Sequence, residues 1–320
     1  MRSIAADPGV IEVVVGILRD AQDRVLLARR REDQPHPGKW EFPGGKIDAG
    51  EGLTEALARE LREELGIALR AAEPLIEFPY RYPGRAVRLH VWQVSRYDGV
   101  PVSRERQALE WVEIDALVTW DLLEANRPVV HALQLPAIYA ITDGKRYGER
   151  EMLARMERGL ERGLRLVQVR EKGLEGRRLV EFTRAAVALC RRYRARILVN
   201  GDPALVVECG ADGIHLDSGR LAEYEQRPLP SHLWVAASCH DRAQLDKAAR
   251  LEADFAVLSP VKATRSHPEA QPLGWERFRE LCAGVPFPVY ALGGMSAPDI
   301  PAARRAGGQG VAMLGAAWED

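Results

Sequence analysis

The hydrophobic positions of the first 134 residues predict strands, one central helix and more strands. Val87, Leu89 and Val91 alternate with polar neighbours, as they do in a half-buried strand. In the central segment a leucine recurs at every fourth position and forms one apolar stripe of an amphipathic helix, at Leu53, Leu57, Leu61 and Leu65. The predicted strands cover residues 10–18, 24–28, 74–80 and 86–95, and a final helix covers residues 126–133.

The pattern changes after residue 134. Short apolar runs now alternate with helical stretches, and this order predicts eight strands separated by helices. The runs cover residues 137–142, 166–169, 197–199, 213–216, 234–237, 255–258, 288–292 and 310–314. We therefore predict an α+β domain with a mixed sheet at residues 1–134 and an α/β domain, a (β/α)8 TIM barrel, at residues 135–320.

The composition is that of an ordinary globular protein and argues against several kinds of partner. Of the 320 residues, 46% are hydrophobic and 28% are charged, and 45 basic against 46 acidic residues give a net charge of −1. This balance provides no basic surface for a nucleic-acid polymer or an anionic membrane. No apolar run approaches the roughly 20 residues that span a bilayer. The four cysteines lack CxxC spacing, so we expect a cytoplasmic protein with reduced thiols.

Three glutamates share one face of the leucine-rich helix. Glu60, Glu63 and Glu64 stand at i, i+3 and i+4, where each like-charge pair costs about a few tenths of a kcal/mol. A cation of higher charge than Lys would relieve that repulsion, and carboxylate oxygens prefer a hard ion such as Mg2+ or Mn2+. A solvated acidic surface would have the same spacing. The preceding segment from Phe42 to Gly45 favours the metal, because its two glycines let backbone groups approach a ligand.

The segment from Gly45 to Ile67 fits the pattern G-x5-E-x7-R-E-U-x-E-E-x-G-U, in which U is aliphatic. Its fixed positions are Gly45, Glu51, Arg59, Glu60, Leu61, Glu63, Glu64, Gly66 and Ile67. This pattern is the signature of the Nudix hydrolases, which the first domain therefore resembles. The likeness to MutT-type 8-oxo-dGTP diphosphatases extends to residues 41–47, 105–107, 110–111 and 124–129. It implies the Nudix fold, a mixed sheet sandwiched by helices.

The resemblance to MutT-type enzymes also implies a set of metal ligands. The ion would be Mg2+, with Mn2+ as a substitute, held by the carbonyl of Gly44 and by the carboxylates of Glu60, Glu63, Glu64 and Glu105. Arg59 would hold the acidic face in place by pairing with Glu51. Glu60 or Glu105 would take the proton of the attacking water. Without the resemblance, Glu105 fits an ordinary surface glutamate in a polar loop.

Three further residues match the nucleotide pocket of these enzymes. Asn126 matches the asparagine that reads the oxidised purine edge, and an amide offers both a donor and an acceptor. Asn126 also fits a helix N-cap. Phe42 and Arg30 match residues that line the same pocket, and they also fit a core aromatic and a solvated strand-end arginine. The implied reaction is the Mg2+-dependent hydrolysis of 8-oxo-dGTP to 8-oxo-dGMP and pyrophosphate, a step of nucleotide-pool sanitation and DNA repair.

In the second domain, polar residues follow the predicted strands, which is where (β/α)8 barrels place their sites. These residues are Thr142, Asp143, Gln168, Arg170, Glu171, Lys172, Asn200, His215, Ser238 and His240. Glycines follow the last two strands, with Gly293 and Gly294 after the seventh and Gly315 after the eighth. Such positions bind phosphate in barrels of this kind, so we expect a phosphate-bearing ligand there.

This half resembles thiamine-phosphate synthase and its TenI relatives across roughly its whole length. Gln168, Arg170 and Lys172 match the Q-x-R-x-K that grips a pyrimidine diphosphate in the synthases. Asn200 matches the asparagine of a motif that the synthases share. The resemblance implies a pyrimidine diphosphate or a thiazole phosphate as the ligand of the barrel.

Three residues bear on which of these relatives the barrel follows. Gly201 and Arg220 stand about where the synthases have magnesium-binding acids, which is a departure from the synthase pattern. His240 matches the histidine that TenI, a thiazole phosphate tautomerase, uses as its acid/base group. His240 also fits an ordinary histidine at the end of a strand.

Three hypotheses follow for the whole chain. In the first, the Nudix half hydrolyses 8-oxo-dGTP and the TenI-like barrel binds thiazole phosphate or nothing. In the second, the Nudix half cleaves a pyrimidine or thiamine diphosphate, and the barrel is a thiamine-phosphate synthase or a thiazole tautomerase. In the third, the barrel is a stabilising or dimerising scaffold. Because the sequence ends just after the last predicted strand, we expect the barrel flank to be covered by the first domain or by a second protomer of a homodimer.

Overall fold

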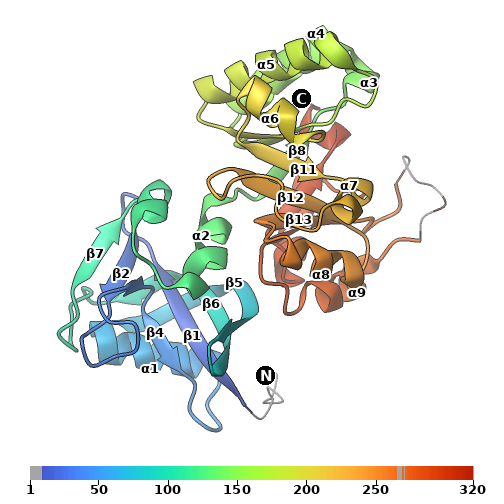
Figure 1. Cartoon of the computed structure of the whole chain (residues 1–320). Coiled ribbons are helices and arrows are strands. Elements are labelled where there is room, and N and C mark those ends of the chain that lie inside the picture. Colours follow the sequence, from blue (N-terminus) through green and yellow to red (C-terminus); the bar gives the residue numbers. More distant parts are fainter. Residues whose placement is uncertain (1–8, 265–268, 270, 320) are drawn as a thin grey trace. The chain divides into compact units, whose positions relative to one another are not determined.

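The computed structural model describes residues 9–264, 269 and 271–319, and the chain divides into two units, one up to Gln134 and one from Leu135 (Figure 1). The strands of the first unit are β1 (Val10–Leu18), β2 (Val25–Arg29), β3 (Trp40–Glu41), β4 (Gly44–Lys46), β5 (Ala68–Tyr82), β6 (Arg85–Asp98) and β7 (Leu109–Val112). Its helices are α1 (Leu53–Leu65) and α2 (Arg127–Gln134), with the short 3-10 turns η1 (Ile114–Thr119) and η2 (Glu124–Asn126).

Two sheets form the first unit. The larger sheet has the strand order β4-β1-β6-β5, in which β1 and β6 run parallel and the outer pairs run antiparallel. The smaller sheet has the order β3-β2-β7 and is antiparallel. The predicted α+β domain with a mixed sheet is therefore confirmed. β5 and β6 extend beyond the predicted strands because they pair along their whole length as one hairpin, which turns at Gly84 (φ +80°).

β1 organises the larger sheet because its two faces meet different helices. Val14 and Leu18 pack in one apolar cluster with the leucines of α1, whereas Val15 and Ile17 pack in the cluster that contains α2. The division follows from the two-residue period of a strand. Gly16 allows α1 to approach closely, since a Cβ at this position would lie 3.2 Å from two leucine side chains of the helix.

α1 buries the leucine stripe that the sequence predicts. Leu57, Leu61 and Leu65 are fully buried, and Leu53 is partly buried in the first turn. Burying one leucine stabilises a fold by about 1.5–3 kcal/mol. Gly66 ends the helix in the left-handed conformation (φ 69°, ψ 20°), which suits a residue without a Cβ. The stripe fixes the rotation of α1, and so it also fixes where the acidic side chains of the helix lie.

The second unit is a closed barrel of parallel strands, as the sequence predicts. The strands are β8 (Ile138–Ile141), β9 (Leu166–Val169), β10 (Arg196–Val199), β11 (Gly213–Leu216), β12 (Trp234–Cys239), β13 (Phe255–Leu258), β14 (Val289–Ala291) and β15 (Gly310–Met313). The helices are α3 (Gly144–Tyr147), α4 (Glu149–Glu161), α5 (Gly176–Arg192), α6 (Pro203–Cys209), α7 (Ser218–Glu223), α8 (Arg242–Arg250), α9 (Gly274–Cys282) and α10 (Ile300–Arg305), with the turns η3 (Ala297–Asp299) and η4 (Gly315–Ala317). Among the described residues, no helix is long and apolar enough to cross a bilayer.

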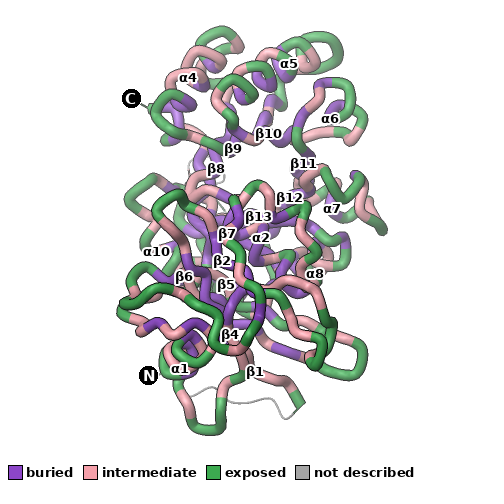
Figure 2. The backbone as a smooth tube through the Cα atoms, turned by 90° about the vertical axis from the view of Figure 1, so that its left-hand side faces the viewer, coloured by how far each residue is buried: buried purple, intermediate pink, exposed green. Residues whose placement is uncertain are grey.

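The barrel has one apolar core inside its strands and another between the strands and the helices. Tyr139, Phe255 and Tyr290 pack together inside, with ring centroids 5.3 to 5.8 Å apart. Figure 2 shows the outer arrangement, with buried strands and exposed outer turns on α4 and α5. Trp318 follows β15 and η4, is fully buried in the outer core, and donates its indole N–H to the carbonyl of Ile141 over 2.6 Å.

A buried histidine joins three strands of the first unit. His90 on β6 is 5% exposed, and its Nε2 lies 2.7 Å from Glu12 Oε2 on β1. Its Nδ1 lies 3.5 Å from Glu77 Oε2 on β5. Burial by itself lowers the pKa of His90, but the hydrogen bonds to Glu77 and Glu12 outweigh burial and raise the pKa above its ordinary value.

A His90→Gln variant tests this interaction. A group whose pKa is raised by folding adds stability that is fully present below its unfolded pKa and is lost as the pH rises through its folded pKa. We expect the variant to lose about 1–2 kcal/mol of unfolding free energy near pH 6, the scale of a charged hydrogen bond, and to approach the wild type at alkaline pH. Urea unfolding at the two pH values measures the difference. An equal loss at both would contradict a charged His90.

Candidate active site

A pair of glycines sets the distance between the sheet and the acidic side chains of α1. Gly44 has a φ of +146°, and a Cβ there would lie 2.1 Å from the carbonyl oxygen of Val14 on β1. A Cβ on Gly45 would lie 2.4 Å from the carboxylate of Glu60. Only glycine permits both approaches. The backbone of β4 and the carboxylate of Glu60 are therefore in direct contact.

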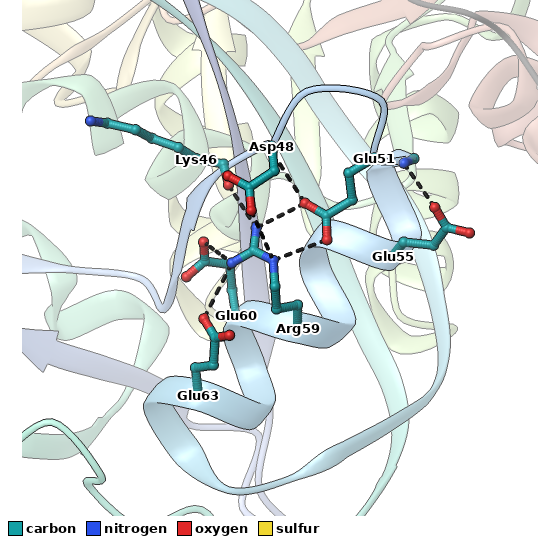
Figure 3. Close-up of polar contacts among 8 residues, drawn as sticks. Lys46, Asp48, Glu51, Glu55, Arg59, Glu60 and Glu63 are labelled. Atoms are coloured by element: carbon teal, nitrogen blue, oxygen red, sulfur yellow. Dashed lines mark hydrogen bonds and ion pairs between the residues drawn. The ribbon is translucent and has the colours of Figure 1, made fainter.

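Arg59 supplies a positive charge within the acidic cluster, as Figure 3 shows. Its Nε and Nη2 donate to the carboxylate of Glu51 at 3.0 and 2.9 Å, so the pair expected from the sequence is present. Its Nη1 donates to Glu60 at 2.8 Å and to Glu63 at 3.2 Å, and its Nη2 donates to the carbonyl of Lys46 at 2.9 Å. The hydrogen bond with Arg59 lowers the pKa of Glu51.

Buried carboxylates gather beside that guanidinium. Burial raises the pKa of Glu64 to about 8, and the negative charges of Glu41, Glu60 and Glu105 add to the rise. The N–H of Gly44 opposes it by donating to Glu64 Oε2 over 3.0 Å. The sequence did not single out Glu41, because its place in the cluster depends on strand β3 and not on the spacing of α1.

The cluster has the donor chemistry of a divalent-ion site. Buried carboxylates that raise one another's pKa are stabilised by a hard cation, which prefers oxygen ligands. In this conformation, no group of three Asp, Glu, His or Cys side chains in the described part of the chain stands close enough to hold one ion. Arg59 donates hydrogen bonds to the carboxylates of two of the predicted metal ligands, Glu60 and Glu63. The residues fit Mg2+ by the chemistry of their oxygen donors, and they would have to come closer together than in this conformation to hold one ion.

A second group of candidates lies on the α2 side of the larger sheet. Asn126 is 3% exposed, and its Nδ2 is buried without a hydrogen-bond partner among the described residues. Leaving a buried donor unsatisfied costs about 1–3 kcal/mol. Phe42 is also 3% exposed and belongs to the apolar cluster on this face, so it serves as a core aromatic. The unsatisfied amide of Asn126 marks a place where a ligand acceptor would be stabilising.

Arg30 and Glu41 form a half-buried ion pair beside two tyrosines. Arg30 Nη1 lies 2.6 and 2.8 Å from the two carboxylate oxygens of Glu41. Burial raises the pKa of Tyr82, whose hydroxyl also feels the charges of Glu41, Arg30 and Glu124. Tyr80 packs against Tyr82 with ring centroids 4.8 Å apart and donates to Glu124 over 3.0 Å. The two tyrosines were not among the predicted residues, although their spacing of two places them on one face of β5.

The barrel candidates divide between the centre of the barrel and its rim. At the centre, Gln168 Nε2 donates to the hydroxyl of Tyr139 over 3.0 Å, and that hydroxyl lies 3.1 Å from His215 Nδ1. His215 Nε2 lies 2.8 Å from Ser238 Oγ. Burial lowers the pKa of His215 to about 3, so the ring is neutral. Gln168 is thus fully buried within a hydrogen-bonded chain that joins four strands.

Other candidates lie at the rim. Asn200 Nδ2 donates to the carbonyl of His215 over 3.3 Å, and Lys172 is exposed. The backbone N–H of Arg170 donates to a threonine hydroxyl. His240 is exposed, and its Nδ1 lies 2.8 Å from the carbonyl of Ser259. A carbonyl can only accept, so Nδ1 of His240 carries a proton and Nε2 is the nitrogen that can accept one.

Of the predicted glycines at the ends of β14 and β15, the pair after β14 occupies positions that exclude a side chain. Gly293 and Gly294 have left-handed φ values of +102° and +62°, and a Cβ on Gly294 would lie 2.8 Å from the carbonyl oxygen of Ala263. A Cβ on Gly315 would lie 2.7 Å from Nη1 of Arg146. The backbone after the last strand is therefore next to a guanidinium, which suits an anionic ligand.

The positions where the synthases have magnesium-binding acids hold no carboxylate. The two nearest aspartates act as helix caps: Asp202 accepts the N–H of Ala204, and Asp217 accepts the N–H of Arg220. Arg220 Nη1 lies 4.0 Å from Asp202 Oδ2. The departure at Gly201 and Arg220 therefore extends to the use of the neighbouring acids.

Comparison with known proteins gives a match for each unit. The NUDIX domain family matches residues 11–133, and the thiamine monophosphate synthase family matches residues 138–317. "8-oxo-dGTP diphosphatase" of Escherichia coli (strain K12) is 36% identical over 124 residues, 39% of this chain and 96% of that protein. "CTP pyrophosphohydrolase" of the same organism is 37% identical over 123 residues, 38% of this chain and 90% of that protein. "Putative thiamine-phosphate synthase 2" of Aquifex aeolicus (strain VF5) is 40% identical over 184 residues, 57% of this chain and 97% of that protein.

The glycine pair allows a matched test of the acidic site. In Gly45→Ala the new methyl meets the flexible end of Glu60, so we expect that carboxylate to move while the fold persists. Mn2+ binding, measured by calorimetry, should weaken at least about tenfold with little change in melting temperature. In Gly44→Ala the methyl meets the backbone of β1, so the melting temperature itself should fall. Unchanged Mn2+ affinity in a folded Gly45→Ala variant would exclude Glu60 from the metal site.

Proposed function

Since the chain belongs to the NUDIX family through residues 11–133 and to the thiamine monophosphate synthase family through residues 138–317, we propose that its first domain hydrolyses 8-oxo-dGTP to 8-oxo-dGMP and pyrophosphate. The main support is the buried Nδ2 of Asn126, which has no hydrogen-bond partner in the described part of the chain. The second domain binds a phosphate-bearing ligand of the thiamine pathway under this proposal.

The amide of Asn126 suits an 8-oxopurine better than an ordinary guanine. A carboxamide presents a donor and an acceptor side by side. The 8-oxo form of guanine carries a proton on N7 beside the O6 acceptor, so its edge complements the amide. Guanine instead presents acceptors at both N7 and O6. An unmatched buried group costs about 1–3 kcal/mol, which is enough to select the oxidised base by a factor of about ten to one hundred.

In the reaction we assign roles to the residues of the acidic cluster. Glu60, Glu63, Glu64 and Glu105, with the carbonyl of Gly44, hold the metal. A bound Mg2+ would supply positive charge against the phosphate oxygens and acidify the attacking water. Glu105 is better placed than Glu60 to accept the proton of that water, because Glu60 is held by Arg59 at 2.8 Å. Arg59 positions the cluster through Glu51 and acts on the substrate only indirectly.

A second candidate function concerns the same site with a different substrate. The thiamine monophosphate synthase domain in the same chain favours a thiamine-pathway diphosphate as the compound that the first domain cleaves. The CTP pyrophosphohydrolase among the relatives adds a pyrimidine nucleotide to the compounds worth testing. The oxidised purine is favoured over these by the unsatisfied amide of Asn126 and by the 8-oxo-dGTP diphosphatase among the relatives.

In the barrel we propose that Arg170, Lys172 and the glycines after β14 and β15 bind the phosphates of a pyrimidine diphosphate or a thiazole phosphate. His240 presents Nε2 as a proton acceptor, which suits a tautomerisation more than a synthase reaction. The absence of carboxylates at Gly201 and Arg220 supports the same choice. A barrel that only stabilises the chain is the remaining alternative.

A substrate panel with Asn126→Ala tests the proposed hydrolysis. We expect the wild type with Mg2+ to turn over 8-oxo-dGTP faster than dGTP, CTP or thiamine diphosphate. The variant should lose about ten- to one-hundred-fold in kcat/KM for 8-oxo-dGTP and much less for dGTP, because only the oxidised edge uses the amide fully. Glu64→Gln serves as the control that abolishes turnover of every substrate. A wild type that prefers a thiamine diphosphate would replace the proposal with the second candidate.

Calorimetry tests the barrel. We expect the full chain to bind thiazole phosphate or the pyrimidine diphosphate, and Arg170→Ala to weaken binding by about tenfold or more through loss of a charged hydrogen bond. Arg177→Ala is the matched control, because Arg177 is an exposed arginine on α5 that pairs with Glu181. No binding of either compound to the wild type would leave the scaffold as the role of the barrel.

A further inference from the structure

A cleft of about 500 Å3 opens beside the carboxylate cluster of the first unit, and charged residues line it throughout. They are Arg31, Asp33, Arg104, Glu105 and Arg106. Three of them come from the loop between β6 and β7, and two follow β2. A surface that brings three guanidinium groups together is costly unless anions neutralise it. The lining itself supplies only two carboxylates.

The hydrogen bonds of Arg31 join the two segments of chain that line this cleft. Its Nε and Nη2 donate to the carboxylate of Asp33 at 3.0 and 3.1 Å, and its Nη1 donates to the backbone carbonyl of Glu105 at 3.0 Å. The same guanidinium lies 3.7 Å from Glu105 Oε2. Arg31 therefore fixes the loop that carries Glu105, and it is a positioning residue.

Arg104 and Arg106 stand on either side of Glu105 in the sequence, and their guanidinium groups have no polar partner among the described residues. Neither guanidinium has a hydrogen bond or an ion pair with any residue that the structure describes, and both side chains are exposed. The loop that holds them is ordered by other contacts. The N–H of Arg104 donates to the carbonyl of Glu64 at 2.9 Å, and the hydroxyl of Ser103 donates to Gln107 at 3.2 Å. Two guanidinium groups without a polar partner among the described residues thus line one cleft, on a loop whose backbone is held in place, and that of Arg104 lies beside Gly66 at the end of α1.

Residues in and next to the cleft contact carboxylates of the acidic cluster. Arg30 and Arg31 are consecutive, yet Arg30 pairs with Glu41 whereas Arg31 contacts Glu105. Besides burial, the negative charges of Glu41 and Glu105 both raise the pKa of Glu64. The cleft therefore adjoins the carboxylates of the candidate active site through Glu105, which lines the cleft and acts on Glu64.

We propose that Arg104 and Arg106 bind the terminal two phosphates of the nucleoside triphosphate and hold the pyrophosphate after it is released from the nucleotide. The inference rests on the proposed function and names the part of the substrate that the cleft recognises. A guanidinium binds phosphate oxygens in pairs, and two of them match the charge of a diphosphate. The cleft then selects triphosphates over shorter chains and makes pyrophosphate an inhibitor of the hydrolysis.

The test uses the full chain with Arg104→Gln, Arg106→Gln and the double substitution. Arg70→Gln is the matched control, because Arg70 is an exposed arginine on β5 that pairs with Asp98 outside the cleft. Pyrophosphate and orthophosphate are titrated by calorimetry in EDTA, which measures the cleft without divalent ions. Arg170→Ala is titrated in parallel, so that pyrophosphate held by the barrel is counted separately. Inhibition of 8-oxo-dGTP hydrolysis by pyrophosphate is measured on the same proteins.

We expect the double variant to bind and be inhibited by pyrophosphate at least tenfold more weakly, to raise KM for 8-oxo-dGTP, and to keep kcat within a few-fold. Orthophosphate should bind more weakly than pyrophosphate to the wild type, and the Arg70→Gln protein should match the wild type. Unchanged pyrophosphate affinity and KM in the double variant, with 8-oxo-dGTP still hydrolysed, would overturn the subsite and leave the function intact. A wild type that binds pyrophosphate through these arginines but does not cleave 8-oxo-dGTP would overturn the function and leave the subsite.

Discussion

The close contact between β1, β4 and α1 is the constraint on which the candidate active site depends. β4 pairs with β1 because Gly44 places no Cβ against the backbone of its neighbour. The buried Leu61 and Leu65 then fix the rotation of α1 on the same strand. Glu60 and Glu64 each precede one of these leucines, so they are carried to the edge of the apolar interface and lose part of their water. The packing of the helix therefore decides the electrostatics of the site.

The site neutralises its buried carboxylates only in part. Arg30 pairs with Glu41, and Arg59 bridges three other glutamates, whereas Glu64 accepts a single backbone N–H. Burial and its acidic neighbours raise the pKa of Glu64 to about 8. A group in that condition gains from any positive charge that arrives with a ligand. Arg59 donates to one oxygen each of Glu60 and Glu63, so it neutralises part of their charge and leaves the other oxygen of each carboxylate for a different partner.

The sequence predicts the features that depend on local period and on chain order. The leucine stripe gave α1, and alternating apolar runs gave the barrel strands to within two residues at either end. Glu41 and Tyr82 could not be found in this way, because they reach the site through the pairing of strands, whose register packing decides. Gln168 matches a ligand-gripping position, yet its amide is fully buried against Tyr139, a contact that no spacing reveals. Motifs thus predicted the candidate site, and tertiary contacts added residues to it.

The consecutive arginines after β2 contact two different segments of the first unit. In extended chain, neighbouring side chains leave on opposite sides, so Arg30 supports the side near Tyr82 and Arg31 supports the loop of Glu105. Under the proposed function, a nucleotide whose base meets Asn126 would place its phosphates at the carboxylates of α1 and the loop of Glu105. Each arginine thus positions a different carboxylate-bearing segment, and neither can bind a phosphate with the same nitrogen without giving up that contact.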